Sequence, residues 1–288
     1  MNRIFNLFGE WLKSILIPPL VSFLNSMFDQ LNDTIGGTAA ALADTPEQFQ
    51  PEVFHMVRTI SENVIIPIAG IILTFIACYE LIQLVISHNN LANFETWIFF
   101  KWIFKTFVAV ELITHTFDIT LAVFDVARYV VEQSARIILG DTAVDGSALV
   151  GLEATLQTKS LGEILVLFVE VFFIRLVLIG LGLLVMVIVY GRMIEIYLMV
   201  SLAPIPFATF GNREQSMVGQ NYLRSLFALG FQAFLIMICI GIYAVLIRTA
   251  VFSEDIVMSL LGVLVYTLLL VFTMFRTGGI ARSVFHAH

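Results

Sequence analysis

Charged residues are scarce in this sequence. Only 13% of its 288 residues are Asp, Glu, Lys or Arg, about half the share that soluble domains carry. In contrast, 59% of the residues are hydrophobic and the mean hydropathy is +0.95. A chain of this composition has too little polar surface to face water on all sides. The sequence therefore excludes a soluble domain and predicts an integral membrane protein.

Cysteines, clustered basic residues and catalytic motifs are also missing or few. The two cysteines, Cys78 and Cys239, lie within apolar runs and form no CxxC motif, so neither a disulfide framework nor a metal site is predicted. The 15 Lys and Arg residues are scattered and the net charge is −7, which argues against a nucleic-acid groove. HExxH and GxSxG motifs are absent and the five histidines are dispersed. We expect no enzyme activity and no cofactor.

Strand-like alternation is missing too, and apolar runs of helical length take its place. Crossing about 30 Å of hydrocarbon takes roughly 20 helical residues. We therefore expect an all-α fold, a polytopic membrane helix bundle with about five transmembrane helices. The predicted spans are residues 63–86, 97–124, 162–190, 225–247 and 256–275.

The N-terminal part differs from the spans because polar residues interrupt it. Residues 1–60 are expected to form an amphipathic interfacial segment and a loop, the loop covering residues 36–50. Polar residues such as Asp29 occur too often in this segment for a membrane-spanning helix, which favours a helix that lies among the lipid headgroups. The Pro18–Pro19 pair predicts a kink in this helix.

Residues 61–288 are expected to form the transmembrane domain, with an extracytoplasmic loop near 126–160. Residues 121–139 carry charges at helical spacing, and residues 140–160 are polar. The distribution of Lys and Arg predicts that the N-terminus lies outside and the C-terminus in the cytoplasm.

One predicted span, residues 97–124, contains a polar stripe. At about 100° per residue its ionisable side chains fall within about 140° of the helix circumference. Facing lipid would be costly, so the stripe either packs against other helices with its lysines reaching the interface, or lines a watery path or subunit contact. The stripe comprises Lys101, Lys105, Glu111, His115 and Asp118.

Further ionisable residues lie at membrane depth. Glu170 and Arg175 lie about 140° apart around their helix, so each needs another partner or reaches a headgroup. A turn near Gly191 is expected to precede a pair formed three residues apart by Arg192 and Glu195. The candidate intramembrane charges are Glu80, Glu170, Arg175, Arg192 and Glu195.

Two prolines interrupt the apolar run "IYLMVSLAPIPFATFGN", residues 196–212. They lack N–H groups and release carbonyls near Val200 and Leu202. In hydrocarbon each unpaired group costs about several kcal/mol, so a broken helix persists only inside protein or beside water. We expect the helix to stop near Leu202 and residues 203–211 to be extended or re-entrant, with a kinked helix as the alternative. The broken-helix segment is marked by Pro204, Pro206, Phe207 and Gly211.

The C-terminal third carries a family resemblance. "YLMVSLAPIPFATFGN", then "GQNYLRSLFALGFQAFLIM" at 219–237 and the ending "FRTGGIARSVFHAH" resemble the polytopic inner-membrane subunit of conjugative type IV secretion systems. The similarity is to the TrbL-like conjugal transfer family, in its branch on mobile elements of Gram-positive bacteria. By this resemblance, the family's Pro-containing segment corresponds to Pro204, Pro206 and Phe207, and the segment after it to Asn221, Tyr222 and Arg224.

The resemblance implies a membrane channel or scaffold subunit that supports transfer of single-stranded DNA with its relaxase across the cell membrane. It implies as partners further copies of the chain in a homo-oligomer, other secretion-channel subunits, ATPases and membrane lipids, with the DNA–protein substrate passing only transiently. The alternative is a secondary transporter or ion channel subunit that uses a broken helix. Such a transporter is expected to contain a second, matching broken segment, and the sequence offers none.

Overall fold

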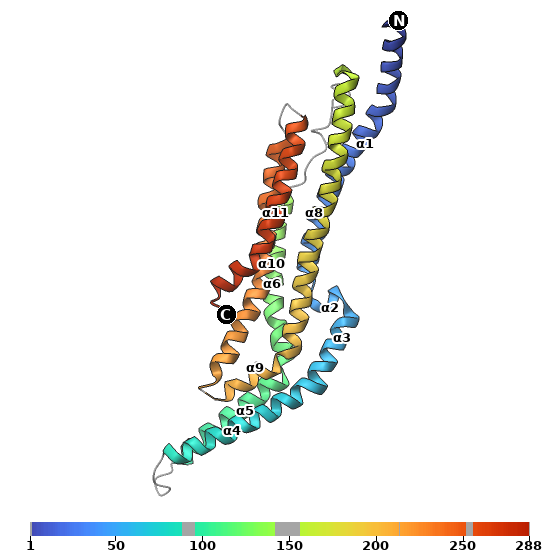
Figure 1. Cartoon of the computed structure of the whole chain (residues 1–288). Coiled ribbons are helices and arrows are strands. Elements are labelled where there is room, and N and C mark those ends of the chain that lie inside the picture. Colours follow the sequence, from blue (N-terminus) through green and yellow to red (C-terminus); the bar gives the residue numbers. More distant parts are fainter. Residues whose placement is uncertain (1, 88–95, 142–155, 213, 252–255, 288) are drawn as a thin grey trace. The chain divides into compact units, whose positions relative to one another are not determined.

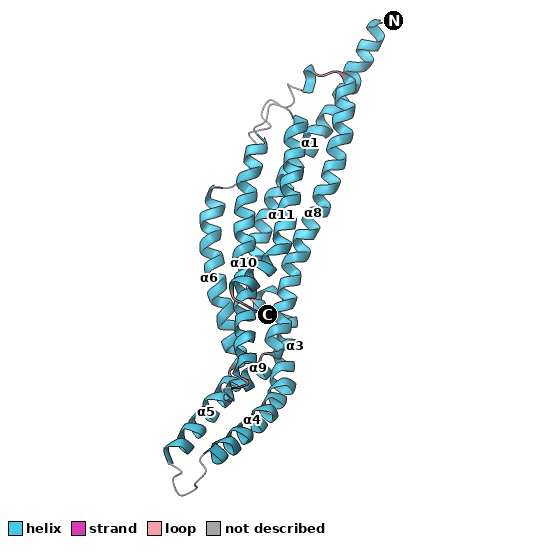
Figure 2. Ribbon diagram, turned by 60° about the vertical axis from the view of Figure 1, so that its left-hand side comes forward, coloured by secondary structure: helices cyan, strands magenta, loops and turns pink. Residues whose placement is uncertain are grey.

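The described part of the chain is helical throughout. The computed structural model describes residues 2–87, 96–141, 156–212, 214–251 and 256–287, and in these ranges it contains helices and no strand (Figure 2). This confirms the predicted all-α class. The elements are α1 (Asn2–Ala43), α2 (Pro46–Phe49), α3 (Pro51–Ile60), the π-helix η1 (Ser61–Ile65), α4 (Ile66–Ser87), α5 (Thr96–Thr114), α6 (Thr116–Asp141), α8 (Leu161–Leu202), α9 (Pro204–Ala208), the 3-10 helix η4 (Thr209–Gly211), α10 (Ser216–Val251) and α11 (Ile256–Val284).

Five helical segments of the described chain are long and apolar enough to cross a membrane. They are Gly9–Ala43, Pro51–Ile86, Leu161–Gly211, Ser216–Thr249 and Val257–Val284. The number of candidate spans agrees with the five predicted from the sequence, but the segments that form them differ. The N-terminal helix qualifies, whereas the predicted span 97–124 is divided between two helices.

The chain forms two compact units, each discontinuous in sequence. Unit 1 consists of Met1–Leu42, Glu132–Val189 and Leu235–Arg276, and unit 2 of Ala43–Val131, Tyr190–Phe234 and Thr277–His288. The division at residue 60 drawn from the sequence concerns placement in the membrane, and it stays a prediction.

Unit 1 is built on a seam between α1 and α8, which lie alongside each other in Figure 1. Phe23 of α1 packs on Phe168 with ring centroids 5.7 Å apart, and Thr34 lies beside Gly182, so the two helices run parallel. From Ile164 to Ile188 the buried residues of α8 recur at spacings of three and four, as in a coiled coil. They are Ile164, Leu167, Val171, Ile174, Leu178, Leu181, Val185 and Ile188.

One expectation about the N-terminal segment is wrong, and the kink expected at the Pro18–Pro19 pair stays a prediction. Helix α1 passes through Pro18 and Pro19 without a break and extends to Ala43, so the loop expected over 36–50 is helical for most of its length. Both prolines are exposed, whereas Leu20 and Leu24 beside them are fully buried. Both prolines therefore lie away from the packed side of α1, and the buried side, which includes Leu20 and Leu24, holds the helix together. Interfacial placement of this segment stays a prediction.

Unit 2 is built on the antiparallel pair α4 and α5, with α9 packed against both (Figure 1). Helix α3 joins this core through Phe54, whose ring meets that of Phe117 edge to face at 5.5 Å. The hydroxyl of Tyr197 donates to the carbonyl of Pro46 at 2.6 Å and so ties α8 to α2.

The predicted span 97–124 is not one helix. Helices α5 and α6 meet at His115 with a bend of 67°. The hydroxyl of Thr116 lies 2.6 Å from the carbonyl oxygen of Leu112 and 2.8 Å from that of Ile113. Bonds of this kind from Thr to the preceding turn weaken the helix and favour bending, and here they accompany the change of direction. Within the loop expected near 126–160, α6 remains helical to Asp141, and residues 142–155 lie outside the described residues.

Candidate functional site

The broken segment begins where α8 ends, at Leu202, as the sequence predicts. In a regular helix the carbonyl of Val200 would accept a hydrogen bond from residue 204, but Pro204 has no N–H. The Ala203 amide donates to this carbonyl instead, at 3.3 Å. The chain then forms the short helices α9 and η4, so this segment is not extended, and a re-entrant course or a kinked helix remain as the predictions. The predicted turn at Gly191 is wrong, because α8 runs continuously through that residue. An isolated glycine weakens a helix without ending it.

Tyr222 of α10 supplies the donor that the break removes. In a regular helix the carbonyl of Met199 would accept from the Ala203 amide, which here turns to Val200 instead. The Tyr222 hydroxyl donates to that Met199 carbonyl at 2.9 Å, and its ring meets Phe207 edge to face at 5.9 Å. The backbone of α8 is therefore completed by a side chain from another helix.

Helix α9 and η4 are seated on α4 and α5. Phe207 is 1% exposed and Pro204 is buried. At Gly211 an added Cβ would lie 2.9 Å from Leu73 Cδ1, so a side chain at this position would require Leu73 of α4 to shift. The surrounding protein thus shields the interrupted backbone.

Thr209 and Gly219 close the segment onto the start of α10, and sequence reasoning missed both. The Thr209 hydroxyl donates to the Pro206 carbonyl at 2.7 Å and accepts from the Gly219 amide at 3.1 Å. A Cβ on Gly219 would lie 2.8 Å from both the Pro206 carbonyl oxygen and Phe210 Cζ. The only sequence signal is a threonine and a glycine on either side of the loop that follows the prolines.

The polar stripe is divided among different partners by the bend. Lys105 forms an ion pair with Glu80 of α4, and Lys101 lies 5.6 Å from the ring centre of Trp97. His115 Nε2 lies 3.5 Å from Glu111, and His115 Nδ1 lies 3.9 Å from Asp118. Glu111, His115 and Asp118 are at least half exposed, so unit 2 does not cover them.

Two of the candidate intramembrane charges of α8 lie in unit 2, and they do not form an ion pair with each other. Arg192 is 6% exposed, and its Nε donates to the Leu229 carbonyl at 3.3 Å. Its Nη1 is buried without a hydrogen-bond partner among the described residues. Glu195 instead forms an ion pair with Arg282 of α11. The expected Arg192–Glu195 pair is therefore replaced by contacts with two other helices.

The other two charges of α8 lie in unit 1. The Arg175 guanidinium lies 4.9 Å from the ring centre of Phe23, a cation–π contact with α1. Glu170 Oε2 is buried, and within the described ranges it has no hydrogen-bond partner. These contacts place Arg175 on the α1–α8 seam, a position that spacing along one helix could not predict.

The described residues contain no group of three or more His, Cys, Asp or Glu side chains placed to hold a metal ion. What the arrangement in unit 2 can do is mechanical. It fixes a helix break between three helices and leaves ionisable side chains exposed at the α5–α6 bend.

Comparison with known proteins gives one match. A family described as TrbL/VirB6 plasmid conjugal transfer like protein matches residues 31–204, which is more than half of the chain. No curated protein and no solved structure matches. The match ends at Pro204, so the stretches at 219–237 and 275–288 that carried part of the sequence resemblance lie outside it.

Proposed function

The chain belongs to the TrbL/VirB6 plasmid conjugal transfer-like family, and from this premise we propose that it is a channel or scaffold subunit of a conjugative type IV secretion system. Family membership makes it a conjugal transfer component, and its apolar helices make it a multi-pass membrane protein. In this role it supports transfer of single-stranded DNA with its bound relaxase across the cell membrane. The family match over residues 31–204 carries the proposal.

The polar side chains at the α5–α6 bend support assembly into a homo-oligomer. Glu111, His115 and Asp118 are uncovered in the single chain, and lipid would reject them. Copies of the chain, or a watery path between copies, would accommodate these groups. The seat of α9 on the α4–α5 pair lies in the same unit and holds this region rigid.

As a member of its family the chain associates with other conjugal transfer subunits. The proposal extends these partners to the secretion ATPases, to membrane lipids and, transiently, to the DNA–protein substrate. The role is structural and not enzymatic.

The protein is placed in the inner membrane, with its N-terminus outside and its C-terminus in the cytoplasm. Because α1 and α8 run parallel, the N-terminus and the start of α8 lie at the same end of unit 1, so both would face the outside. Single cysteines introduced outside the candidate spans by Asn2→Cys and His286→Cys, in a chain with Cys78→Ser and Cys239→Ser, test the orientation. A membrane-impermeant maleimide should label only the first in intact cells. Labelling of the second alone contradicts the orientation.

The transporter alternative gains no support from the N-terminal prolines. Helix α1 is continuous at Pro18 and Pro19. The bend of 67° between α5 and α6 is a second interruption, but residues 111–120 around it contain no proline, so it does not match the Pro-containing segment at α9.

Deletion of the gene from a donor strain tests the function. Transfer of the mobile element should fall to background and return when the gene is supplied on a plasmid, while donor growth stays unchanged. A tagged copy should retain the other secretion subunits after solubilisation in mild detergent. Normal transfer frequency in the deletion strain rejects the proposal.

A further inference from the structure

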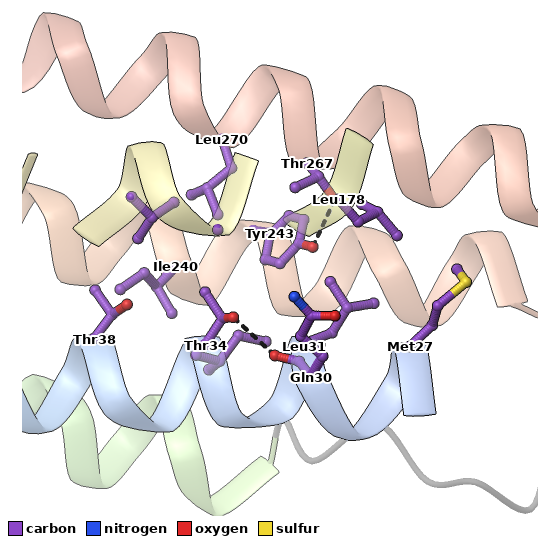
Figure 3. A pocket seen from close by; sticks show the side chains of 13 residues that line it. Met27, Gln30, Leu31, Thr34, Thr38, Leu178, Ile240, Tyr243, Thr267 and Leu270 are labelled. Carbon is purple, nitrogen blue, oxygen red and sulfur yellow. Dashed lines mark hydrogen bonds between the residues drawn. The ribbon is translucent and has the colours of Figure 1, made fainter. Parts of the chain in front are cut away.

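A small cavity lies inside unit 1, where α1 meets α8, α10 and α11 (Figure 3). Its volume, counted over the positions open to the centre of a water molecule, is about 20 Å³. On that measure one water needs about 10–15 Å³. Aliphatic side chains form most of the wall, but Gln30, Thr34, Tyr243 and Thr267 also line it.

The hydroxyl groups of Thr34, Tyr243 and Thr267 at this cavity already donate their protons in hydrogen bonds. The Thr34 hydroxyl donates to the Gln30 carbonyl at 2.8 Å, and the Thr267 hydroxyl donates to the Val263 carbonyl at 2.7 Å. Because each hydroxyl has one proton, Tyr243 must be the donor in its 2.8 Å contact with Thr267. The hydroxyl oxygens of Thr34 and Tyr243 can therefore only accept further hydrogen bonds.

Gln30 provides the complementary group. Its side-chain amide points from α1 towards Tyr243 in Figure 3, and it brings two donors and one acceptor. Tyr243 is 3% exposed, and both helices belong to segments apolar enough to cross a membrane. Polar groups at such depth require partners, since unpaired ones are costly in an apolar surrounding.

We propose that this cavity is a binding site for a single water molecule that bridges α1 and α10. The water donates its two protons to the hydroxyl oxygens of Tyr243 and Thr34 and accepts from the Gln30 amide. A water molecule fits because the cavity has room for about one. It also supplies the hydrogen-bond donors that the hydroxyl oxygens of Tyr243 and Thr34 can accept. The bridge gives α1 a polar contact to α10 in addition to its apolar seam with α8.

Gly182→Ala tests the site because Gly182 lines the cavity. The added Cβ would lie 3.7 Å from Thr34 Oγ1, an ordinary contact distance, so the methyl group fits sterically and displaces the water. The matched control is Gly180→Ala on the same helix, where the Cβ meets nothing within 4 Å. This control should raise Tm by about 2–4 °C through helix propensity alone.

The proposal expects Gly182→Ala to lack this gain and to leave Tm unchanged or lower, measured on the full chain in detergent. In a Tyr243→Phe background, which keeps the shape but removes one acceptor of the water, the gap between the two alanine variants should shrink. A gain in Tm from Gly182→Ala equal to or larger than that from Gly180→Ala shows a dry cavity and overturns the proposal. A gap that persists unchanged in the Tyr243→Phe background overturns it as well, because it reports steric crowding.

Discussion

At the scale of single residues, the end of α8 depends on hydrogen bonds made by side chains. Proline removes two amide donors, Ala203 redirects its own amide, and Tyr222 then satisfies the Met199 carbonyl. Each step follows from the one before it. A buried carbonyl left without its donor costs about 1–3 kcal/mol. These replacement hydrogen bonds are therefore as important for the stability of the segment as the packing around it.

Tyr222→Phe should lower the stability of the protein by about 1–3 kcal/mol, because the Met199 carbonyl loses its donor while the ring stays in place. Thermal unfolding in detergent measures this as a fall in Tm of several degrees. Tyr129→Phe is the control, since Tyr129 is largely exposed. Equal Tm values for the two variants would count against the role given to the Tyr222 hydroxyl.

Gly219→Ala should destabilise the protein by about 1–3 kcal/mol through overpacking. Its Cβ would lie 2.8 Å from a backbone carbonyl, which cannot move aside as the end of a side chain can. Gly191→Ala, whose Cβ meets nothing within 4 Å, should instead leave Tm unchanged or raise it. The same unfolding assay compares the two variants. A Gly219→Ala variant with unchanged Tm would contradict the close approach of Gly219 to the Pro206 carbonyl.

At the scale of elements, the fate of each proline follows from which face of its helix it occupies. Pro18 and Pro19 are exposed on a helix whose other face is buried, and α1 continues. Pro204 is buried, and α8 ends before it. The hydrophobic runs of the sequence predict the helices and the end of α8, but spacing along one helix cannot say which face is buried.

The parts of the site that escaped prediction depend on partners distant in sequence. The Lys105–Glu80 pair, the Tyr222–Met199 bond and the Arg175–Phe23 contact each join two helices. The bend at His115 escaped for a local reason, because Thr116 competes for backbone carbonyls that an unbroken helix would use itself. The sequence prediction placed Asp118 by its angle around one straight helix. It therefore could not show that the bend separates Asp118, in α6, from the part of the stripe that lies in α5.

Pro204→Ala combined with Pro206→Ala should let α8 continue beyond Leu202, since both amide donors return. Helix α9 would then leave its seat on α4 and α5, and both oligomer size and transfer frequency should fall. Native gel analysis of the solubilised complex and mating assays measure the two effects. Wild-type values in both assays would show that the break is not required.

At the scale of the whole molecule, the exposed ionisable groups at the α5–α6 bend require a covering that the single chain does not provide. Lys101→Leu with Glu111→Leu should weaken assembly at least about tenfold, a loss of about 1.4 kcal/mol, and should therefore reduce complex size and lower transfer frequency. Glu52→Leu, which changes an exposed acidic residue of α3, is the control. Unchanged complex size and transfer in the double variant would remove this bend from the proposed interface.

The parallel seam of α1 and α8 also sets an order of events during synthesis. The buried residues of α8 leave the ribosome more than a hundred residues after α1, a delay of roughly 5–30 s at usual rates of translation. Throughout that interval the side of α1 that carries Leu20, Leu24 and Leu31 has no partner helix to pack against. The seam can therefore form only after much of α8 has been made, so α1 is made first but packs late.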